Sequence, residues 1–482
     1  MFSKEYFIYL LKSKKYLLLF IGLITILNLL GNKESSLSMI ISCLIALVSA
    51  YGMPLIVFYF VHDKKAVDTF FSIPVSRKAL LYSSLLFCIV CTAVPYLISA
   101  VVFGLSKSFD ALLILSYVLI VTLMTICALV IFNTMIYLLA NNAIDGVIML
   151  GAYTVLPLSV LICINSFLRS FVCGVIDIPL EFLGYCSPLY MFVSAALKYG
   201  DKMPDFISAI FSLLISVAGL FVLKKQFVER QVERASTTSD GFFTYPFIIA
   251  VYVMLSLISI ASFFSFDYSS LFKYFSDYFF VYLLLFAVFV AAHFIYQRKL
   301  YFDYRLPAYF VAALAISLIF AFAARGSRGF GISESYVKND RNAYYTLNEW
   351  CEADSETYQY LSRQIGSDET FISIYVDAGN EKTRPELNEE TAAIFEKLRR
   401  EAIDLYYSDY QAYRDSDTGN LNISSYDGNR RNSYFYQTRP ITIEELMTLA
   451  EDKNCHVMIN CELGDYVMGS NGQLRVTNIY AN

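Results

Sequence analysis

Long apolar runs dominate the first 324 residues of this 482-residue chain. Each run is about 20 residues long, which is the length of helix that crosses the hydrocarbon core of a bilayer. Short polar connections separate the runs, so we expect each one to be a membrane-spanning helix. The nine predicted spans are residues 16–31, 38–61, 79–104, 110–139, 144–166, 205–223, 243–265, 276–296 and 306–323.

After residue 324 the long apolar runs end, and short segments with the hydrophobic spacing of strands and helices follow, which is typical of a folded α+β domain. Residues 370–377 alternate as a strand does. Residues 389–413 carry apolar side chains at helical spacing, and Thr442 with Glu445 forms a capping box that begins another helix. Further strands are expected at residues 456–461 and 473–480.

The predicted fold is therefore a polytopic α-helical membrane protein with a C-terminal soluble α+β domain. We divide it into a six-helix core (1–235), three additional transmembrane helices (236–324) and the α+β domain (325–482). Residues 2–15 place aromatic and aliphatic side chains on one helix face, with lysines at its end, which is typical of an interfacial helix. A plain polar lead into the first span is the alternative. Residues 167–204 are too broken to span and are expected to form a pair of short re-entrant or surface helices.

Composition agrees with this class, since 57% of the residues are hydrophobic and the mean hydropathy is +0.52. The charges in the short connections predict the orientation. By our count, fifteen Lys and Arg residues lie on the side of the N-terminus and six on the other side. Because the positively charged side faces the cytosol, the N-terminus is predicted to be cytoplasmic. An odd number of spans then places the C-terminal domain outside the cytoplasm.

Motifs for independent catalysis are absent from the sequence. It contains no Gly-Lys dipeptide and hence no phosphate loop for ATP, no His-Glu-x-x-His and no Gly-x-Ser-x-Gly. Charged residues are almost absent from the spans, and Asp145 at the mouth of the fifth span fits an interface residue better than an ion site. The chain is thus predicted not to be an enzyme, and to bind no cofactor or metal. A Cys455–Cys461 disulfide and two free thiols are both compatible with the spacing.

The loop 62–78 between the second and third spans is the most distinctive polar segment. It combines the acidic Asp68, the apolar pair Phe70 and Phe71, a proline turn at Pro74 and the cations Arg77 and Lys78. The stretch Asp68-Thr69-Phe70-Phe71-Ser72-Ile73-Pro74-Val75-Ser76-Arg77-Lys78 resembles one, commonly of the form His-Ser-Leu-Pro-(Ile/Val)-(Ser/Thr)-Arg, found in type-2 ABC transporter permeases of Gram-positive bacteria. In this chain Phe71 stands in place of the His and Ile73 in place of the Leu.

The resemblance covers about residues 1–235. The further spans and the C-terminal domain resemble a subgroup with such an extension, the Ytr-like permeases. This likeness implies a permease subunit in a bacterial cell membrane that exports an amphipathic, peptide-like or antibiotic substrate. The expected partners are a separate ABC ATPase, a second permease in a homodimer or heterodimer, and the lipid bilayer, but no nucleic acid.

In this interpretation the site is the ATPase-coupling loop. Phe70 and Phe71 would pack into the partner, Pro74 would end the short helix that contains Asp68, and Arg77 and Lys78 would anchor the loop at headgroups or at the ATPase. The alternative for the loop is an ordinary cationic connection whose phenylalanines dip into lipid. The alternative for the whole protein is a membrane sensor whose outer domain binds a ligand and relays the signal inward.

Overall fold

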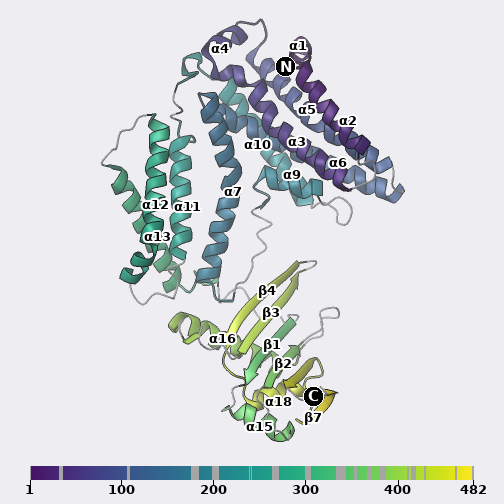
Figure 1. Cartoon of the computed structure of the whole chain (residues 1–482), viewed down its shortest axis with the longest axis vertical. Helices are drawn as coiled ribbons and strands as arrows, with labels where there is room; N and C mark the ends of the chain where they lie inside the picture. The colour runs from purple at the N-terminus through teal and green to yellow at the C-terminus, as the bar shows by residue number, and fades with distance from the viewer. Residues whose placement is uncertain are drawn as a thin grey trace. The chain divides into compact units, whose positions relative to one another are not determined.

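The protein is mostly helical and ends in a small sheet domain, as the computed structural model in Figure 1 shows. The structure describes most of the chain between Phe2 and Ile479. The described ranges are 2–31, 36–105, 109–174, 184–197, 206–237, 239, 241–262, 271–298, 305–332, 344–351, 355–365, 372–378, 387–409, 412–413, 419–427, 430–461 and 464–479.

Eight helices in the described ranges are long and apolar enough to cross a membrane, and a bent pair at the N-terminus would make a ninth. The sequence pattern predicted nine such segments, in agreement with the upper count. The helices of the N-terminal half are α1 (Lys4–Ser13), α2 (Lys15–Gly31), α3 (Ser36–Val57), η1 (Tyr59–His62), α4 (Lys64–Phe71), α5 (Arg77–Leu105), α6 (Phe109–Leu139) and α7 (Ala143–Phe171). They are followed by α9 (Pro188–Leu197), α10 (Phe206–Val228), η2 (Val232–Arg234), α11 (Tyr245–Ser262), α12 (Leu271–Gln297) and α13 (Arg305–Gly326).

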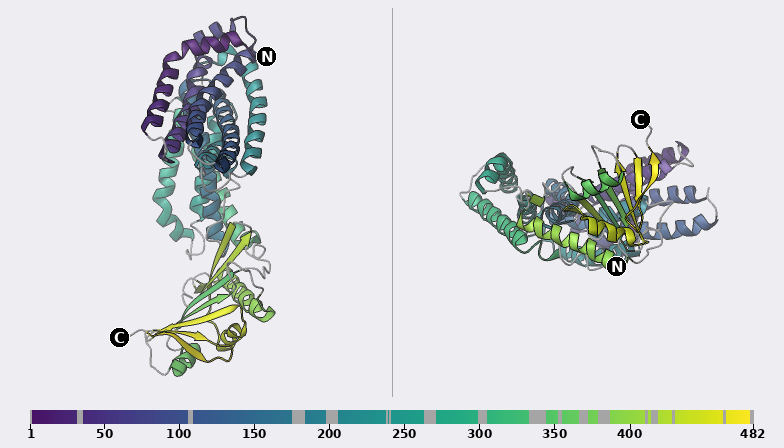
Figure 2. Two further views of the ribbon diagram at one scale, coloured as in Figure 1. Left: turned by 90° about the vertical axis from the view of Figure 1, so that its right-hand side faces the viewer. Right: turned by 90° about the horizontal axis from the view of Figure 1, so that it is seen from below.

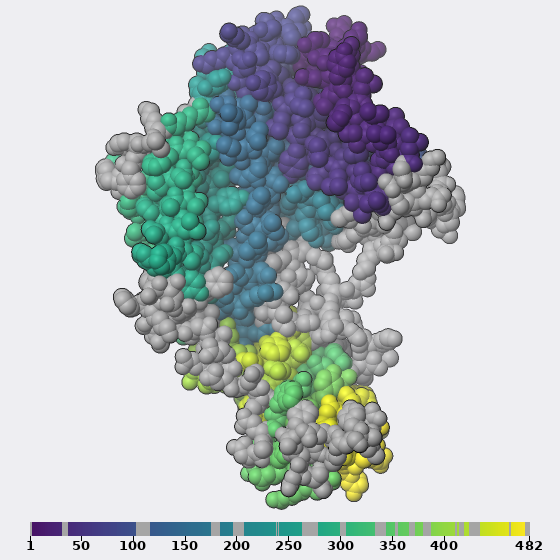
Figure 3. Space-filling view, in the orientation of Figure 1, coloured from purple at the N-terminus to yellow at the C-terminus, as the bar shows by residue number. Residues whose placement is uncertain are grey.

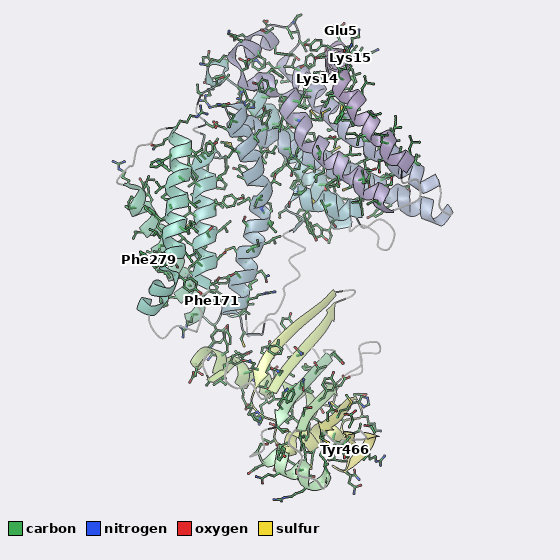
Figure 4. All side chains as sticks on the ribbon, viewed as in Figure 1. Glu5, Lys14, Lys15, Phe171, Phe279 and Tyr466 are labelled. Carbon is green, nitrogen blue, oxygen red and sulfur yellow. The ribbon has the colours of Figure 1, made fainter. Side chains whose placement is uncertain are left out.

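The bent pair consists of α1 and α2, which meet at 69°. Ser3 caps α1 by accepting a hydrogen bond from the Tyr6 N–H, and Tyr6 and Leu10 are buried on one side of the helix. Figure 4 labels Lys14 and Lys15 at the bend. The structure therefore contains the short helix that the sequence predicted before the first apolar run, and its place at a membrane interface stays a prediction.

The connection 167–204 contains one described helix, α9, over the predicted apolar stretch 189–197. The other stretch, 180–183, lies outside the described residues.

The chain divides into two compact units. The first contains residues 1–161, 180–253 and 286–303, and the second contains 162–179, 254–285 and 304–482. Helices α7, α11 and α12 thus contribute to both units. The three-part division made from the sequence stays a prediction.

In the second unit, seven antiparallel strands form one sheet in the order β4-β3-β1-β2-β5-β6-β7 (Figure 2). The strands are β1 (Tyr344–Cys351), β2 (Ile372–Ala378), β3 (Gly419–Asp427), β4 (Arg430–Thr438), β5 (Cys455–Cys461), β6 (Gly464–Met468) and β7 (Leu474–Ile479). The helices α15 (Glu356–Ile365), α16 (Glu389–Ser408) and α18 (Ile443–Glu451) contribute apolar side chains to the core that the sheet builds.

The predicted elements of this domain are confirmed where the hydrophobic period was clear. The strands β2, β5 and β7 and the helix α16 lie within two residues of their expected starts, and Thr442 and Glu445 make the capping box of α18. The sequence analysis did not identify β1, β3, β4 or β6. The hairpin β3–β4 is rich in Asn, Ser and Arg, which weakens the alternation that marks a strand.

The sheet domain is fastened to the C-terminal end of α7. The hydroxyls of Tyr406 and Tyr407 donate to the carbonyl oxygens of Ser170 and Phe171 at 3.0 and 2.7 Å. Phe171 is labelled in Figure 4. Those carbonyls belong to the last turn of a helix, where no intrahelical donor exists, so the two tyrosines satisfy groups that would otherwise be unpaired.

The segment after α7 also enters the sheet domain. The Cys173 side chain is part of the apolar core of the domain, and the Gly174 carbonyl accepts a hydrogen bond from the Phe435 N–H at 2.8 Å. Gly174 has φ +85°, and a Cβ at this position would lie 2.3 Å from the Tyr436 ring. Only glycine fits this close approach.

All ten cysteines are free thiols in the structure. Cys455 and Cys461 begin and end the same strand, β5, so they lie far apart. Of the two alternatives at these positions, the free thiols are the correct one.

A buried carboxyl in the sheet domain should make the stability depend on pH. Glu349 is 1% exposed, and burial raises the pKa of its carboxyl to about 8, although the Ile441 N–H donates to it at 2.8 Å. Between about pH 4.5 and pH 8 the folded protein therefore keeps a proton that the unfolded chain releases.

The free energy of unfolding should consequently fall as the pH rises through this window, by up to about 1.4 kcal/mol per pH unit. The free energy of unfolding of the Glu349→Gln variant, measured by thermal unfolding at several pH values in this window, should not show this dependence on pH. Equal slopes in the native protein and the variant would show that Glu349 does not hold the proton.

Candidate functional site

The candidate site is built on the short helix α4, which lies at one end of the first unit together with α1 (Figure 1). Asp63 caps α4 by accepting a hydrogen bond from the Lys65 N–H at 3.1 Å. The helix is amphipathic, with Val67 buried and Lys64, Lys65, Asp68 and Thr69 exposed on the other side. In Figure 3 this stretch of the chain lies at the surface of the unit.

The helix ends at Phe71, because Ser72 caps it: its N–H donates to the Asp68 carbonyl at 3.1 Å. The Ser72 hydroxyl also donates to the Thr69 carbonyl at 2.9 Å. Pro74 lies three residues beyond the last helical residue and is exposed. Proline is common just after a helix C-cap, since it cannot continue the helix.

The phenylalanine pair packs against the protein itself. The Phe70 ring stacks on Phe60 with the centroids 4.4 Å apart, and the Phe71 ring meets Phe227 edge-on at 5.8 Å. Phe227 is fully buried near the end of α10 and also contacts Phe58 and Phe60. Both members of the pair are half-buried. The sequence analysis expected an apolar tip for a partner to bind, whereas these rings join α4 to η1 and to the end of α10.

Arg77 holds the other end of the loop. Its guanidinium lies 4.3 Å from the centroid of the Phe71 ring and donates to the carbonyls of Val228 and Arg230 at 3.0 and 3.2 Å. Val228 is the last residue of α10. A cation at a helix C-terminus supplies donors to unpaired carbonyls and interacts well with the helix dipole. Arg77 is therefore engaged within the chain, and Lys78 beside it is half-buried.

Arg230 caps the C-terminal end of α6, as Arg77 caps that of α10. Its guanidinium donates to the carbonyls of Leu138 and Ala140 at 2.7 and 2.8 Å, at the C-terminal end of α6. Burial, with a contribution from Arg234, lowers the pKa of Arg230 to about 10, so it stays charged at neutral pH.

His62 is buried in the same region, with its ring edge-on to Tyr137 at 4.4 Å. Burial and the nearby Arg230 lower the pKa of His62 to about 3, so its imidazole is neutral. Its backbone carbonyl accepts a hydrogen bond from the Ser236 hydroxyl at 2.8 Å. The linker after α10 is thus tied to the start of the loop.

The linker continues this polar network to the helices that follow. The Ser236 N–H donates to the Asn141 carbonyl at 2.9 Å, and the Asn141 N–H donates to the Ser239 hydroxyl at 2.9 Å. Ser239 in turn donates to Asp145 at 3.1 Å.

Asp145 is the junction at which the network ends. Its carboxylate, 6% exposed, also accepts from the Tyr245 hydroxyl at 3.1 Å and from the Arg298 guanidinium at 2.9 Å. It stands in the first turn of α7, where a negative charge is favoured. Asp145 thereby joins the beginnings of α7 and α11 to the residue that follows α12.

The structure brings together most of the site residues predicted from the sequence, but it turns their side chains in different directions. Asp68 and Pro74 are exposed, whereas Phe70, Phe71, Arg77 and Lys78 are half-buried. Sequence reasoning missed Arg230, Ser236, Ser239 and Arg298. The two linker serines could not be recognised from the sequence, because small polar residues in a linker show no hydrophobic periodicity.

Among the described residues, no group of three or more His, Cys, Asp and Glu side chains is placed to hold a metal ion. No protein family, curated protein or solved structure matches this chain.

Replacing Arg77 should loosen the candidate site. The Arg77→Gln variant loses the charged donors to Val228 and Arg230 and the contact with Phe71. Its free energy of unfolding should fall by about 1–3 kcal/mol, the usual range for charged hydrogen bonds to groups that are left unpaired. Arg234→Gln removes the same charge from an exposed side chain and should change the stability little. Equal thermal unfolding midpoints for the two variants would contradict the capping role.

Proposed function

We propose that this chain is the membrane-spanning subunit of a transporter whose energy comes from a separate ATPase, as its likeness to type-2 ABC permeases suggests. The apolar helices supply the membrane part. The chain has no phosphate loop, and its apolar runs carry almost no charged residue with which to couple an ion gradient, so active transport would draw on a separate ATPase.

The observation that carries the proposal is the two-sided character of α4. Its polar side, with Lys64, Lys65, Asp68 and Thr69, is exposed, while the aromatic rings of its other side are packed on η1 and on the end of α10. A charged exposed side suits recognition by a partner through complementary charge. The aromatic contacts on the opposite side would then pass a displacement of α4 to η1, which follows α3, and to α10.

The network from Arg77 to Asp145 extends this path within the first unit. Its links are side-chain and backbone hydrogen bonds that join the ends of helices to one another and to the linker. Helix ends joined in this way would move together when the ATPase shifts α4. Coupling of this kind requires an element with two arrangements, and α4 is the element that we assign to this role.

The substrate class follows from the same likeness and is an amphipathic, peptide-like or antibiotic compound that is exported. A path for it would run between two permease subunits, alike or different.

Orientation is the first test. In a background with the accessible thiols removed (Cys186→Ser and Cys351→Ser), Asp68→Cys should react with a membrane-impermeant maleimide only after the cells are opened. In the same background, Asn471→Cys in the turn between β6 and β7 should react in intact cells. Both positions are exposed, so burial does not explain a negative result. Labelling of Asp68→Cys in intact cells would end the proposal.

The second test separates recognition from coupling. With a phosphate-loop ATPase that co-purifies with the native chain as partner, Asp68→Lys should weaken complex formation about tenfold, because it reverses an exposed charge on α4. Phe71→Ala should leave the complex intact and lower the stimulation of ATP hydrolysis, because it removes the ring that meets Phe227 and Arg77.

Glu451→Lys makes the same charge change on an exposed residue of the sheet domain and serves as the control. It should leave both measurements unchanged. Native complex formation and native stimulation in both α4 variants would contradict the proposal.

A membrane sensor is the second candidate, and the joint between the sheet domain and α7 favours it. Tyr406, Tyr407 and Gly174 hold the domain to a helix end, so a ligand on the domain could bias that helix. The full chain is the right object to test, because Cys173 is part of the core of the domain. Calorimetry with membrane-active peptide antibiotics should show heat of binding that is lost when the sheet domain is deleted. Absence of heat for all of them would remove the support for this candidate.

A further inference from the structure

The sheet of the C-terminal domain has two different faces. Along β1, the side chains of Tyr345, Leu347 and Glu349 point to the side of the helices, where Tyr345 stacks on Phe395 of α16 at 4.7 Å. The alternate residues of a strand point to the opposite side. The described helices α15, α16 and α18 all join the core on the first face, and none of them covers the second.

The second face is lined by carboxamides and aromatic rings. Trp350 and Asn348 point to it from β1, and both are exposed, Trp350 by 54%. The strand register places Tyr375 of β2 and Asn420 of β3 beside Asn348, on either side of it. Ser373 lies beside Trp350, and Asn460 of β5 follows in the same row.

These side chains form one compact group, which we call the amide face: Asn348, Trp350, Ser373, Tyr375, Asn420 and Asn460. Neighbouring strands are about 4.8 Å apart, and residues two apart on a strand are about 7 Å apart. Asn348 therefore lies about 7 Å from Trp350 along the strand, and Asn460 about 10 Å from Trp350 across two strands. The sheet holds the backbones of all six rigidly.

The six residues of the amide face carry no charge, and the Asp465 carboxylate of β6 lies beside Asn460 in the same row of the register. The nearest row of the same face holds one carboxylate, Asp377, and one imidazole, His456, which oppose each other in the register. An acidic ligand would find no cation among the six residues, and a basic ligand would find a carboxylate only at their edge, at Asp465. Carboxamides and hydroxyls instead offer donors and acceptors side by side, which suits a neutral ligand with many hydroxyl groups.

We propose that the amide face binds a neutral saccharide chain. The ring of Trp350 would stack on the apolar face of one sugar ring, and the carboxamides of Asn348, Asn420 and Asn460 would bind the hydroxyl or acetamido groups of that ring and its neighbours. An aromatic platform with a few placed polar groups provides both contact area and orientation.

A peptide is the other neutral chain to consider, and the amide face suits it less well. Peptides that bind a sheet add to an edge strand through their backbone and place alternate side chains in pockets. The amide face lies in the middle of the sheet, on β3, β1, β2 and β5, where every backbone is already paired. Figure 4 labels Tyr466 of β6, the strand that lies next to β5 in the sheet.

The chain contains one tryptophan, so the emission of Trp350 reports on this face directly. The full-length protein is placed in lipid nanodiscs, since maltoside and glucoside detergents carry sugars that would compete. Short unbranched oligosaccharides of glucose and of N-acetylglucosamine are titrated while tryptophan is excited selectively. The emission should shift with saturation, and quenching by acrylamide should fall as the ring is covered.

Asn348→Ala should weaken binding about tenfold, the cost of leaving polar groups of the ligand unpaired, while the tryptophan signal itself remains. Gln364→Ala removes an exposed carboxamide from α15, on the helical side of the domain, and should leave binding unchanged. Trp350→Ala, followed by calorimetry, should abolish binding.

The proposal is overturned if neither oligosaccharide series changes the emission, or if Asn348→Ala and Gln364→Ala bind equally well. It is overturned in favour of a peptide site if only the neutral peptides run as a comparison produce the change. None of these measurements involves the ATPase, so their failure leaves the transporter proposal standing, and a loss of coupling through α4 leaves this one standing.

Discussion

Much of the described first unit depends on how the ends of its apolar helices are paired. The last carbonyl groups of a helix have no donor within it, and in apolar surroundings an unpaired carbonyl is costly. Two arginines meet this need, Arg77 at the end of α10 and Arg230 at the end of α6. Each bonds two carbonyls, so each arginine satisfies a helix end and fixes the segment from which it projects.

The same principle operates in the second unit with neutral donors. Tyr406 and Tyr407 supply hydroxyls to the last turn of α7, and the chain after α7 continues into the core of the sheet domain. The domain therefore shares a hydrogen-bonded joint with a helix. That joint would pass a displacement of the sheet domain to the end of α7.

The position of α4 changes how the loop 62–78 is understood. Aromatic rings next to each other in a cationic loop suggested a hydrophobic tip for a partner to hold. In the folded chain the two rings pack on Phe60 and Phe227. Burial of an aromatic ring against other rings lowers the free energy of the fold more than its exposure to water would. What remains for another protein is the polar side of the helix, and what the rings contribute is a tight connection to the neighbouring helix ends.

The sequence by itself determined the class of fold, because a run of about 20 apolar residues has few stable alternatives to a long helix. It also determined the elements of the C-terminal domain that follow a clear period, such as β2, β5 and α16. Only the tertiary structure decided which way Phe70 and Phe71 face, that Arg77, Arg230 and Asp145 join separate helices, and that Trp350 shares a sheet face with Asn348, Asn420 and Asn460. These facts depend on contacts between residues far apart in the chain, and a local pattern of polarity carries no information about the partner that a side chain will meet.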